Sequence, residues 1–206
     1  MIRKTLLSLG MISALAFPAG AQDKAAAVDQ GKIDAMIKIM FAKTPAEWQA
    51  RTVLDETQRM CTTARSQVSA KEADAIQARE MKTVVFPADG KFLGQWKDGF
   101  KVANNGRGWQ FSDEPGVVPG GNCYACHQMD PKELSYGTLG PSLAGYGKDR
   151  KYDAESIRAA YTKIYNAQAV VACSNMPRFG AMKALNEQQI KDLVAYLFDP
   201  ESPVNK

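Results

Sequence analysis

The sequence predicts a mostly α-helical protein of 206 residues, in which a helical extension precedes a second region that begins with a long loop rich in glycine and asparagine. Two observations predict this class. Apolar residues recur at helical spacing in several segments, and residues with helix-capping side chains stand at the start of most of them. Between residues 84 and 122 this periodicity is lost, and Gly and Asn recur instead, which is typical of turns and extended chain. The chain therefore divides near residue 83.

Residues 1–21 have the pattern of a cleaved secretory signal peptide. Arg3 and Lys4 give a basic start, residues 6–17 are an apolar stretch too short to span a bilayer, and residues 19–21 have the small-x-small form of a cleavage site. An uncleaved anchor is the alternative, and the short apolar stretch disfavours it. Cleavage leaves 206 − 21 = 185 residues with no further run long enough to cross a membrane, so we expect a soluble periplasmic protein.

The net charge of the chain is small. Loss of Arg3 and Lys4 with the signal peptide lowers the formal net charge from +4 to +2. Proteins that bind nucleic acid through its phosphates usually carry a strong basic field, so this balance gives no support to nucleic-acid binding.

Residues 22–83 form the predicted extension, with three helices. The first covers residues 31–41 and is amphipathic. The second begins at a capping box in residues 44–47, with proline at the first helical position, and runs to about residue 66. The third begins at a capping box in residues 69–72 and runs to about residue 81. We expect the apolar faces of all three helices to lie in the core.

Residues 84–206 form the predicted second domain. Residues 84–87 are a candidate short strand, and four aromatic rings interrupt the loop that follows. We interpret these rings as anchors of the loop to the core rather than as a partner site. Two helices are predicted further on, at residues 153–165 and after Asn186, where Gln189 completes a capping box. The rings are Trp96, Phe100, Trp109 and Phe111.

Residues 123–127, Cys-Tyr-Ala-Cys-His, carry the attachment pattern of a c-type haem. Cysteines three residues apart lie on the same side of one helical turn, so Cys123 and Cys126 can each bond one vinyl group of a porphyrin. The neutral imidazole of His127 is then placed beneath the macrocycle as an axial iron ligand. The sequence thus predicts one covalently attached haem c.

Two other chemistries use similar residues. A redox-active dithiol requires a neighbouring βαβ pattern, and none surrounds this motif. A structural zinc site requires four Cys or His ligands at fixed spacings. The chain has four cysteines and one histidine in all, and two of the cysteines are far from the motif. Both alternatives are therefore disfavoured.

The second axial ligand cannot be a histidine of this chain, because His127 is the only one. A methionine, a thiolate, a lysine or an open position remains. Met176 is the strongest candidate, since it lies on a predicted loop and a proline follows it. Met182 is its rival, whereas Met129 is too close to His127 to reach the opposite haem face. Four others lie on predicted helices and are expected in the core: Met36, Met40, Met60 and Met81.

Two cysteines, Cys61 and Cys173, are left over after haem attachment. An even number of spare cysteines in an oxidising compartment favours a disulfide between them, which would tie the extension to the loop that carries Met176. Closing a loop of that length constrains the unfolded chain by about 4–5 kcal/mol in the entropy model. The alternatives are two buried thiols, a bridge to a partner, or Cys173 as an iron ligand.

The order of these motifs resembles that of the small mono-haem class I cytochromes c. The haem motif is followed by Gly-Pro-x-Leu at residues 140–143, Met-Pro-x-Phe-Gly at residues 176–180, and a terminal amphipathic helix. The resemblance implies a helical shell around the haem and a hydrogen bond from the outer nitrogen of His127 to the carbonyl of Pro141. It also implies His127 and Met176 as axial ligands, a state suited to one-electron transfer rather than to substrate binding.

A closer resemblance is to the SoxX family, the mono-haem subunits of periplasmic SoxAX cytochromes. Three stretches carry it: Gly-Asn and the haem motif at residues 121–127, Ile-Tyr-Asn-Ala-Gln at residues 164–168, and Ser-Asn-Met-Pro-Arg-Phe-Gly at residues 174–180. The resemblance covers about residues 84–200, and shorter members of the family lack a counterpart of the extension.

The SoxX resemblance implies a heterodimer with a SoxA-type cytochrome subunit that carries the catalytic haem. Such a complex is an L-cysteine S-thiosulfotransferase, which joins thiosulfate oxidatively to a cysteine of a SoxY-type carrier protein. The haem of this chain would pass the two released electrons, one at a time, to a downstream c-type cytochrome. No residue of this chain is then expected to be catalytic.

Two other functions remain open at the level of sequence. A freestanding periplasmic mono-haem electron carrier would need the same motifs without a catalytic partner. A haem enzyme or ligand sensor would need an open sixth position on the iron, which ligation by Met176 opposes.

Overall fold

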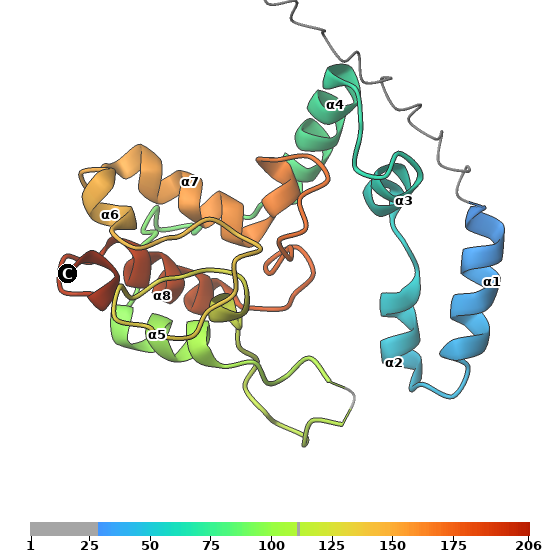
Figure 1. Cartoon of the computed structure of the whole chain (residues 1–206), viewed down its shortest axis with the longest axis horizontal. Coiled ribbons are helices and arrows are strands. Elements are labelled where there is room, and N and C mark those ends of the chain that lie inside the picture. Colours follow the sequence, from blue (N-terminus) through green and yellow to red (C-terminus); the bar gives the residue numbers. More distant parts are fainter. Residues whose placement is uncertain (1–28, 111) are drawn as a thin grey trace, which may run out of the picture.

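The computed structural model describes residues 29–110 and 112–206, and within these ranges it contains helices but no β-strand (Figure 1). This confirms the predicted mostly α-helical class. The predicted signal peptide, the residues that follow it up to position 28, and Phe111 lie outside the described residues. A search of the described ranges finds no helix both long enough and apolar enough to cross a membrane.

The first part of the chain consists of short helices. They are α1 (Gln30–Met40), α2 (Ala46–Gln49), α3 (Glu56–Thr63) and α4 (Ala70–Met81), with a 3-10 turn, η1 (Ala50–Thr52), after α2. The predicted capping box begins α4, since the Ser69 hydroxyl accepts a hydrogen bond from the Glu72 N–H and the Glu72 carboxylate accepts one from the Ser69 N–H. Reciprocal bonds of this kind satisfy two of the N–H groups that a helix start leaves unpaired.

The single helix predicted for residues 44–66 is wrong, because the chain interrupts it before Asp55. The Asp55 carboxylate accepts a hydrogen bond from the Gln58 N–H at 2.8 Å, and the Gln58 side chain accepts one from the Asp55 N–H at 2.9 Å. This capping box holds Asp55 in extended backbone, with φ −74° and ψ 177°, and starts α3 as a new helix. In Figure 1 an extended segment separates α2 from α3.

The apolar face of α1 does not lie in a core, which corrects the expectation from the sequence. No residue of α1 is buried, and Met36 and Met40 are 60% and 68% exposed. Of the four methionines expected in the core from their helical positions, Met81 of α4 is exposed as well. Met60 of α3 is the one of the four that packs beside buried residues. Helical periodicity shows which residues share a face, but it does not show whether another element covers that face.

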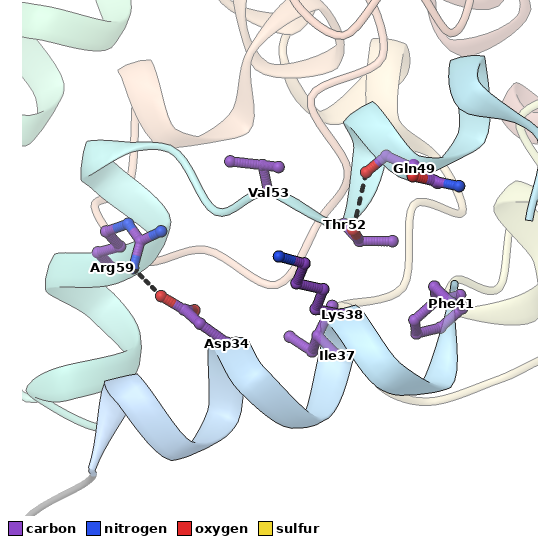
Figure 2. A pocket seen from close by; sticks show the side chains of 8 residues that line it. All are labelled: Asp34, Ile37, Lys38, Phe41, Gln49, Thr52, Val53 and Arg59. Atoms are coloured by element: carbon purple, nitrogen blue, oxygen red, sulfur yellow. Dashed lines mark hydrogen bonds and ion pairs between the residues drawn. The ribbon is translucent and has the colours of Figure 1, made fainter. Parts of the chain in front are cut away.

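A pocket separates α1 from the segment that runs from α2 to α3 (Figure 2). At one end Asp34 of α1 pairs with Arg59 of α3, with 2.9 Å between Oδ2 and Nη1, and at the other the Thr52 hydroxyl donates to the Gln49 carbonyl. About two-fifths of each side chain in the ion pair is exposed, so solvent screens it. No Cys, His or Met lines this pocket, and it is separate from the predicted haem site.

The second part of the chain is built on four helices and three 3-10 turns. They are α5 (Trp96–Asn104), η2 (Cys123–Ala125), α6 (Tyr146–Asp149), α7 (Ala154–Tyr165), η3 (Ala167–Ala169), α8 (Glu187–Phe198) and η4 (Pro203–Asn205). Asp153 caps α7, and the predicted capping box of Asn186 and Gln189 begins α8. The core gathers around these two helices, whose Tyr161 and Tyr196 are fully buried.

Helix α5 lies within the segment that the sequence predicts to be loop. It packs side by side with α8 (Figure 1), and a Cβ at Gly99 would overlap the backbone carbonyl of Asp192. Phe100 adds an edge-to-face contact with Tyr196, with ring centroids 5.8 Å apart. The glycine that permits this close approach is also a poor helix former, which is why the pattern indicated a loop.

The rest of the predicted loop is turn and extended chain, and residues 84–87 form no strand. The Tyr161 hydroxyl donates to the Val85 carbonyl at 3.1 Å, and the Trp109 indole donates to the Gly120 carbonyl at 2.9 Å. Trp96 and Trp109 both pack against the core. These contacts agree with the interpretation of the rings as anchors.

A disulfide and a cluster of polar contacts join α3 and α4 to the second part of the chain. Cys61 of α3 forms the disulfide with Cys173, and their Cα atoms are 5.3 Å apart. Ile76 of α4 is fully buried beside this bond. In the polar cluster, Glu80 of α4 accepts a hydrogen bond from the Arg178 guanidinium at 3.2 Å. The helical extension is thus fastened near residue 173 and again at residue 178.

The ion pair between Glu80 and Arg178 is buried, since Glu80 is 5% exposed and Arg178 is 8% exposed. Asn166 Nδ2 and the Thr57 hydroxyl also donate to the Glu80 carboxylate, and Arg178 donates to Asp55 at 2.5 Å. Burial by itself would raise the pKa of Glu80, but the hydrogen bonds from Thr57, Asn166 and Arg178 outweigh it and lower the pKa below its ordinary value. Glu80 is therefore a carboxylate at neutral pH.

Glu80→Gln is expected to destabilise the protein by about 3–5 kcal/mol at neutral pH, because it removes one partner of a buried ion pair. Since folding lowers the pKa of Glu80, its carboxylate stabilises the fold fully above the unfolded pKa. That contribution to stability is lost as the pH falls through the pKa that Glu80 has in the folded protein. The difference between variant and wild type should therefore shrink below the ordinary Glu pKa of about 4.3. Urea unfolding followed by helical circular dichroism measures it.

Asp34→Asn is the matched control for this experiment. It removes the carboxylate of the partly exposed pair with Arg59, so the free energy of unfolding should change much less than in Glu80→Gln. If the two variants lost the same free energy of unfolding, burial could not be what makes the pair of Glu80 and Arg178 important.

Thiol titration of the haem-loaded protein, unfolded without reductant, should detect no free thiol. Cys123 and Cys126 would be held in thioether bonds, and Cys61 and Cys173 are joined to each other. After a reductant that cleaves disulfides but not thioethers, the count should rise to two. Two thiols before reduction would show that the disulfide does not form.

Candidate functional site

The Cys-x-x-Cys-His motif forms one tight turn of helix. Cys123 begins the 3-10 turn η2, and the N–H groups of Cys126 and His127 both donate to the Cys123 carbonyl, at 3.1 and 2.9 Å. Asn122 precedes the turn in the left-handed region, with φ 46° and ψ 43°, a conformation that Asn tolerates better than most residues. The two sulfurs and the imidazole are therefore presented from five consecutive residues.

The ring of His127 is held by the loop that follows the motif. Its Nδ1 lies 2.7 Å from the carbonyl oxygen of Pro141. A carbonyl can only accept a hydrogen bond, so Nδ1 carries the proton and Nε2 keeps a free lone pair for a metal. Gly140 makes this contact possible, because a Cβ at that position would overlap the imidazole ring.

A cavity of about 260 Å³ lies between the motif and helices α7 and α8. Cys123, His127 and Met176 all line it, so the structure brings together one attachment cysteine, the histidine and the candidate methionine. Cys126, the second attachment cysteine, is not among the lining residues. Most of the remaining lining is apolar and belongs to Met129, Leu143, Ala160, Ile164, Phe179, Leu193 and Leu197. An apolar cavity with a few polar groups at defined positions is the usual form of a cofactor site.

Met176 also lines a second cavity of about 490 Å³ on the side of the extension. Its rival Met182 lines the second cavity but not the first and is 50% exposed, whereas Met176 is half-buried and lines both. The Met176 N–H donates to the Ser174 hydroxyl at 3.2 Å, and Pro177 follows. The position of the side chain thus favours Met176 as the partner of His127.

The environment of the cysteines disfavours the two alternative chemistries. Burial raises the pKa of the Cys123 thiol to about 12, so the thiol is protonated at neutral pH and is a poor redox nucleophile. Among the residues that the structure describes, no group of three or more Cys, His, Asp or Glu side chains is placed to hold a metal ion. The buried thiol of Cys123 is thus poorly suited to the role of nucleophile in a redox-active dithiol.

Two cationic side chains, Lys163 and Arg150, also line the first cavity. Burial lowers the pKa of Lys163, whose ammonium donates to the Ala167 carbonyl at 3.4 Å, and Arg150 stacks on the Tyr146 ring at 3.6 Å. A haem carries two propionates, and cations at the edge of its cavity can pair with them. The sulfurs, the imidazole, the thioether, the apolar lining and these cations fit a covalently attached haem.

Arg178 lies two residues after Met176 and pairs with Glu80 of α4. The sequence assigned neither of the two residues a role. The only signal for Arg178 was a charged residue inside the otherwise apolar Met-Pro-Arg-Phe-Gly stretch. Glu80 gave no signal, because a Glu near the end of a polar helix is usually exposed.

The chain is similar to a known family model, to a curated relative and to a chain of a solved structure. The family model for cytochrome c matches residues 107–199. An uncharacterized lipoprotein of Aquifex aeolicus (strain VF5) is 36% identical over 203 residues, which are 97% of this chain and 95% of that protein. A chain in the crystal structure of SoxXA from P. pantotrophus is 25% identical, with 58% of this chain and 95% of that chain covered and a TM-score of 0.39. This chain therefore belongs to the same family as the Aquifex aeolicus protein, and its C-terminal part is a cytochrome c domain.

Proposed function

We propose that this chain is a periplasmic electron-transfer protein with one covalently attached haem c, held through Cys123 and Cys126 and ligated by His127 and Met176. The observation that carries the proposal is the single cavity lined by Cys123, by Met176 and by His127, whose Nδ1 is bonded to the Pro141 carbonyl. We also propose that residues 1–21 are a cleaved signal peptide, that residues 22–83 are an extension, and that residues 84–206 are the haem domain.

The residues of the chain have distinct tasks in this proposal. The haem, when bound, supplies a centre that takes up and releases single electrons. Cys123 and Cys126 fix its position covalently, and the Pro141 carbonyl holds His127 with Nε2 directed away from the protonated nitrogen. Met176 would be the second ligand of the iron beside His127. A site of this kind favours electron transfer over the binding of small ligands.

We further propose that the chain serves a SoxAX-type complex in thiosulfate oxidation. The support is the resemblance of residues 121–127, 164–168 and 174–180 to the SoxX family. In that role the catalytic centre lies on a SoxA-type partner, thiosulfate is joined to a cysteine of a SoxY-type carrier, and this haem relays the electrons to a further c-type cytochrome. The alternative is a freestanding electron carrier, which the haem cavity supports equally well.

Met176→Ala should abolish the charge-transfer band between methionine sulfur and ferric iron in the visible spectrum. It should also lower the reduction potential, because methionine ligation raises it relative to most other axial ligands. Met182→Ala is the control and should leave both properties close to those of the wild type. The assignment of the ligand would have to be reversed if Met182→Ala, rather than Met176→Ala, removed the band.

Affinity purification of the mature, haem-loaded protein from its own host tests the proposed partner. A second c-type cytochrome should co-purify, and thiosulfate together with the carrier protein should reduce the haem of this chain only when that partner is present. Isolation as a monomer whose haem is indifferent to thiosulfate under these conditions would instead support the freestanding carrier.

A further inference from the structure

The segment that carries Met176 is fastened to the helical extension on both sides of the methionine. Three residues before it, Cys173 forms the disulfide with Cys61 of α3. Two residues after it, Arg178 pairs with Glu80 of α4 and with Asp55 at the start of α3. The only residues between these two attachment points are residues 174–177.

Local hydrogen bonds shape this short segment but anchor it only in part. Cys173 has a left-handed backbone, with φ 56°, and the Ser174 hydroxyl accepts from the Met176 N–H at 3.2 Å. Gln168 reaches the segment through a weak contact of 3.4 Å between its Nε2 and the Ser174 carbonyl. The disulfide and the ion pairs join the two ends of this segment to the extension, and Phe179 beyond it is buried in the main core.

The ion pairs resist movement because they are buried. Arg178 is 8% exposed and Glu80 is 5% exposed, so a displacement of Arg178 would leave the Glu80 carboxylate in a protein interior without its cation. Glu80 is itself held by Thr57 and Asn166, one from each part of the chain. Arg178 is thus fixed at a defined place relative to α3, α4 and the turn after α7.

We propose that the extension positions the axial methionine, and that Cys61 and Glu80 act as positioning residues that keep Met176 within reach of the iron. The inference rests on the proposed ligation by Met176 and goes beyond it, because it assigns a task to residues 55–81. The extension restrains the loop, so the state in which the methionine has left the iron is rarely populated. Release of either attachment increases that population.

Cyanide binding to the ferric, haem-loaded protein measures this population, because cyanide takes the sixth position only when the methionine has left it. Glu80→Gln and the double variant Cys61→Ala/Cys173→Ala should each bind cyanide with an apparent affinity at least about tenfold above wild type, since apparent affinity scales with the fraction of the competent state. Glu80→Asp, which keeps the carboxylate, should lower the cyanide affinity at least part of the way back to the wild-type value. Asp34→Asn, in the pair remote from the loop, should match the wild type.

The charge-transfer band of the methionine is the second readout, taken at a temperature where each variant keeps the helical circular dichroism of the wild type. It should weaken in Glu80→Gln and in the double cysteine variant, and stay unchanged in Asp34→Asn. Should the cysteine variant fail to fold, Glu80→Gln and Glu80→Asp still decide the matter.

Met176→Ala separates failure of this inference from failure of the proposed ligation. Loss of the band in Met176→Ala, together with wild-type cyanide affinity in Glu80→Gln and in the cysteine variant, would overturn the positioning role and leave the ligand assignment intact. A band that survives in Met176→Ala would overturn both. Equal increases in cyanide affinity in Asp34→Asn and Glu80→Gln would also overturn the positioning role, because general loosening would explain them.

Discussion

The buried ion pair of Glu80 and Arg178 joins the two parts of the chain together with the disulfide of Cys61 and Cys173. The described residues of the extension bury few apolar side chains, chiefly Cys61 and Ile76, and α1 buries none. A core of that size gives little stability by itself. The extension therefore keeps its place through the disulfide and the polar cluster, and both end on the segment around Met176.

A second constraint acts on the other side of the haem site. The hydrogen bond from His127 to the Pro141 carbonyl selects the tautomer and the orientation of the ring, and Gly140 leaves the room that it needs. The proximal side is thus built from residues close in sequence to the attachment cysteines. The attachments around Met176 come from α3 and α4, which lie about a hundred residues earlier in the chain. On the proposed ligation, His127 and Met176 would therefore be held by different physical means.

Sequence analysis predicted the parts of this structure that local chemistry determines. The haem motif, the capping boxes at Ser69 and Asn186 and the helices that follow them depend on side chains a few residues apart. One failure is local, since the capping box of Asp55 and Gln58 interrupts the helix predicted for residues 44–66. The others concern long-range contacts. Gly99 disfavours a helix locally, yet close packing on α8 makes one, and the amphipathic face of α1 is covered by no other element of the described residues. Nothing in the sequence indicated that Glu80 is buried, because its partner Arg178 lies 98 positions away.

The connection between extension and haem site must act in both directions. If the extension restrains the loop of Met176, then a bond between Met176 and iron restrains the extension by the same free energy, because coupling between two equilibria is reciprocal. The extension would then be better ordered with the methionine bound than without it. A helical segment with almost no core of its own can therefore keep its structure by being tied to a ligand loop. If Met176 ligates the iron, the same tie would give the extension influence over that bond.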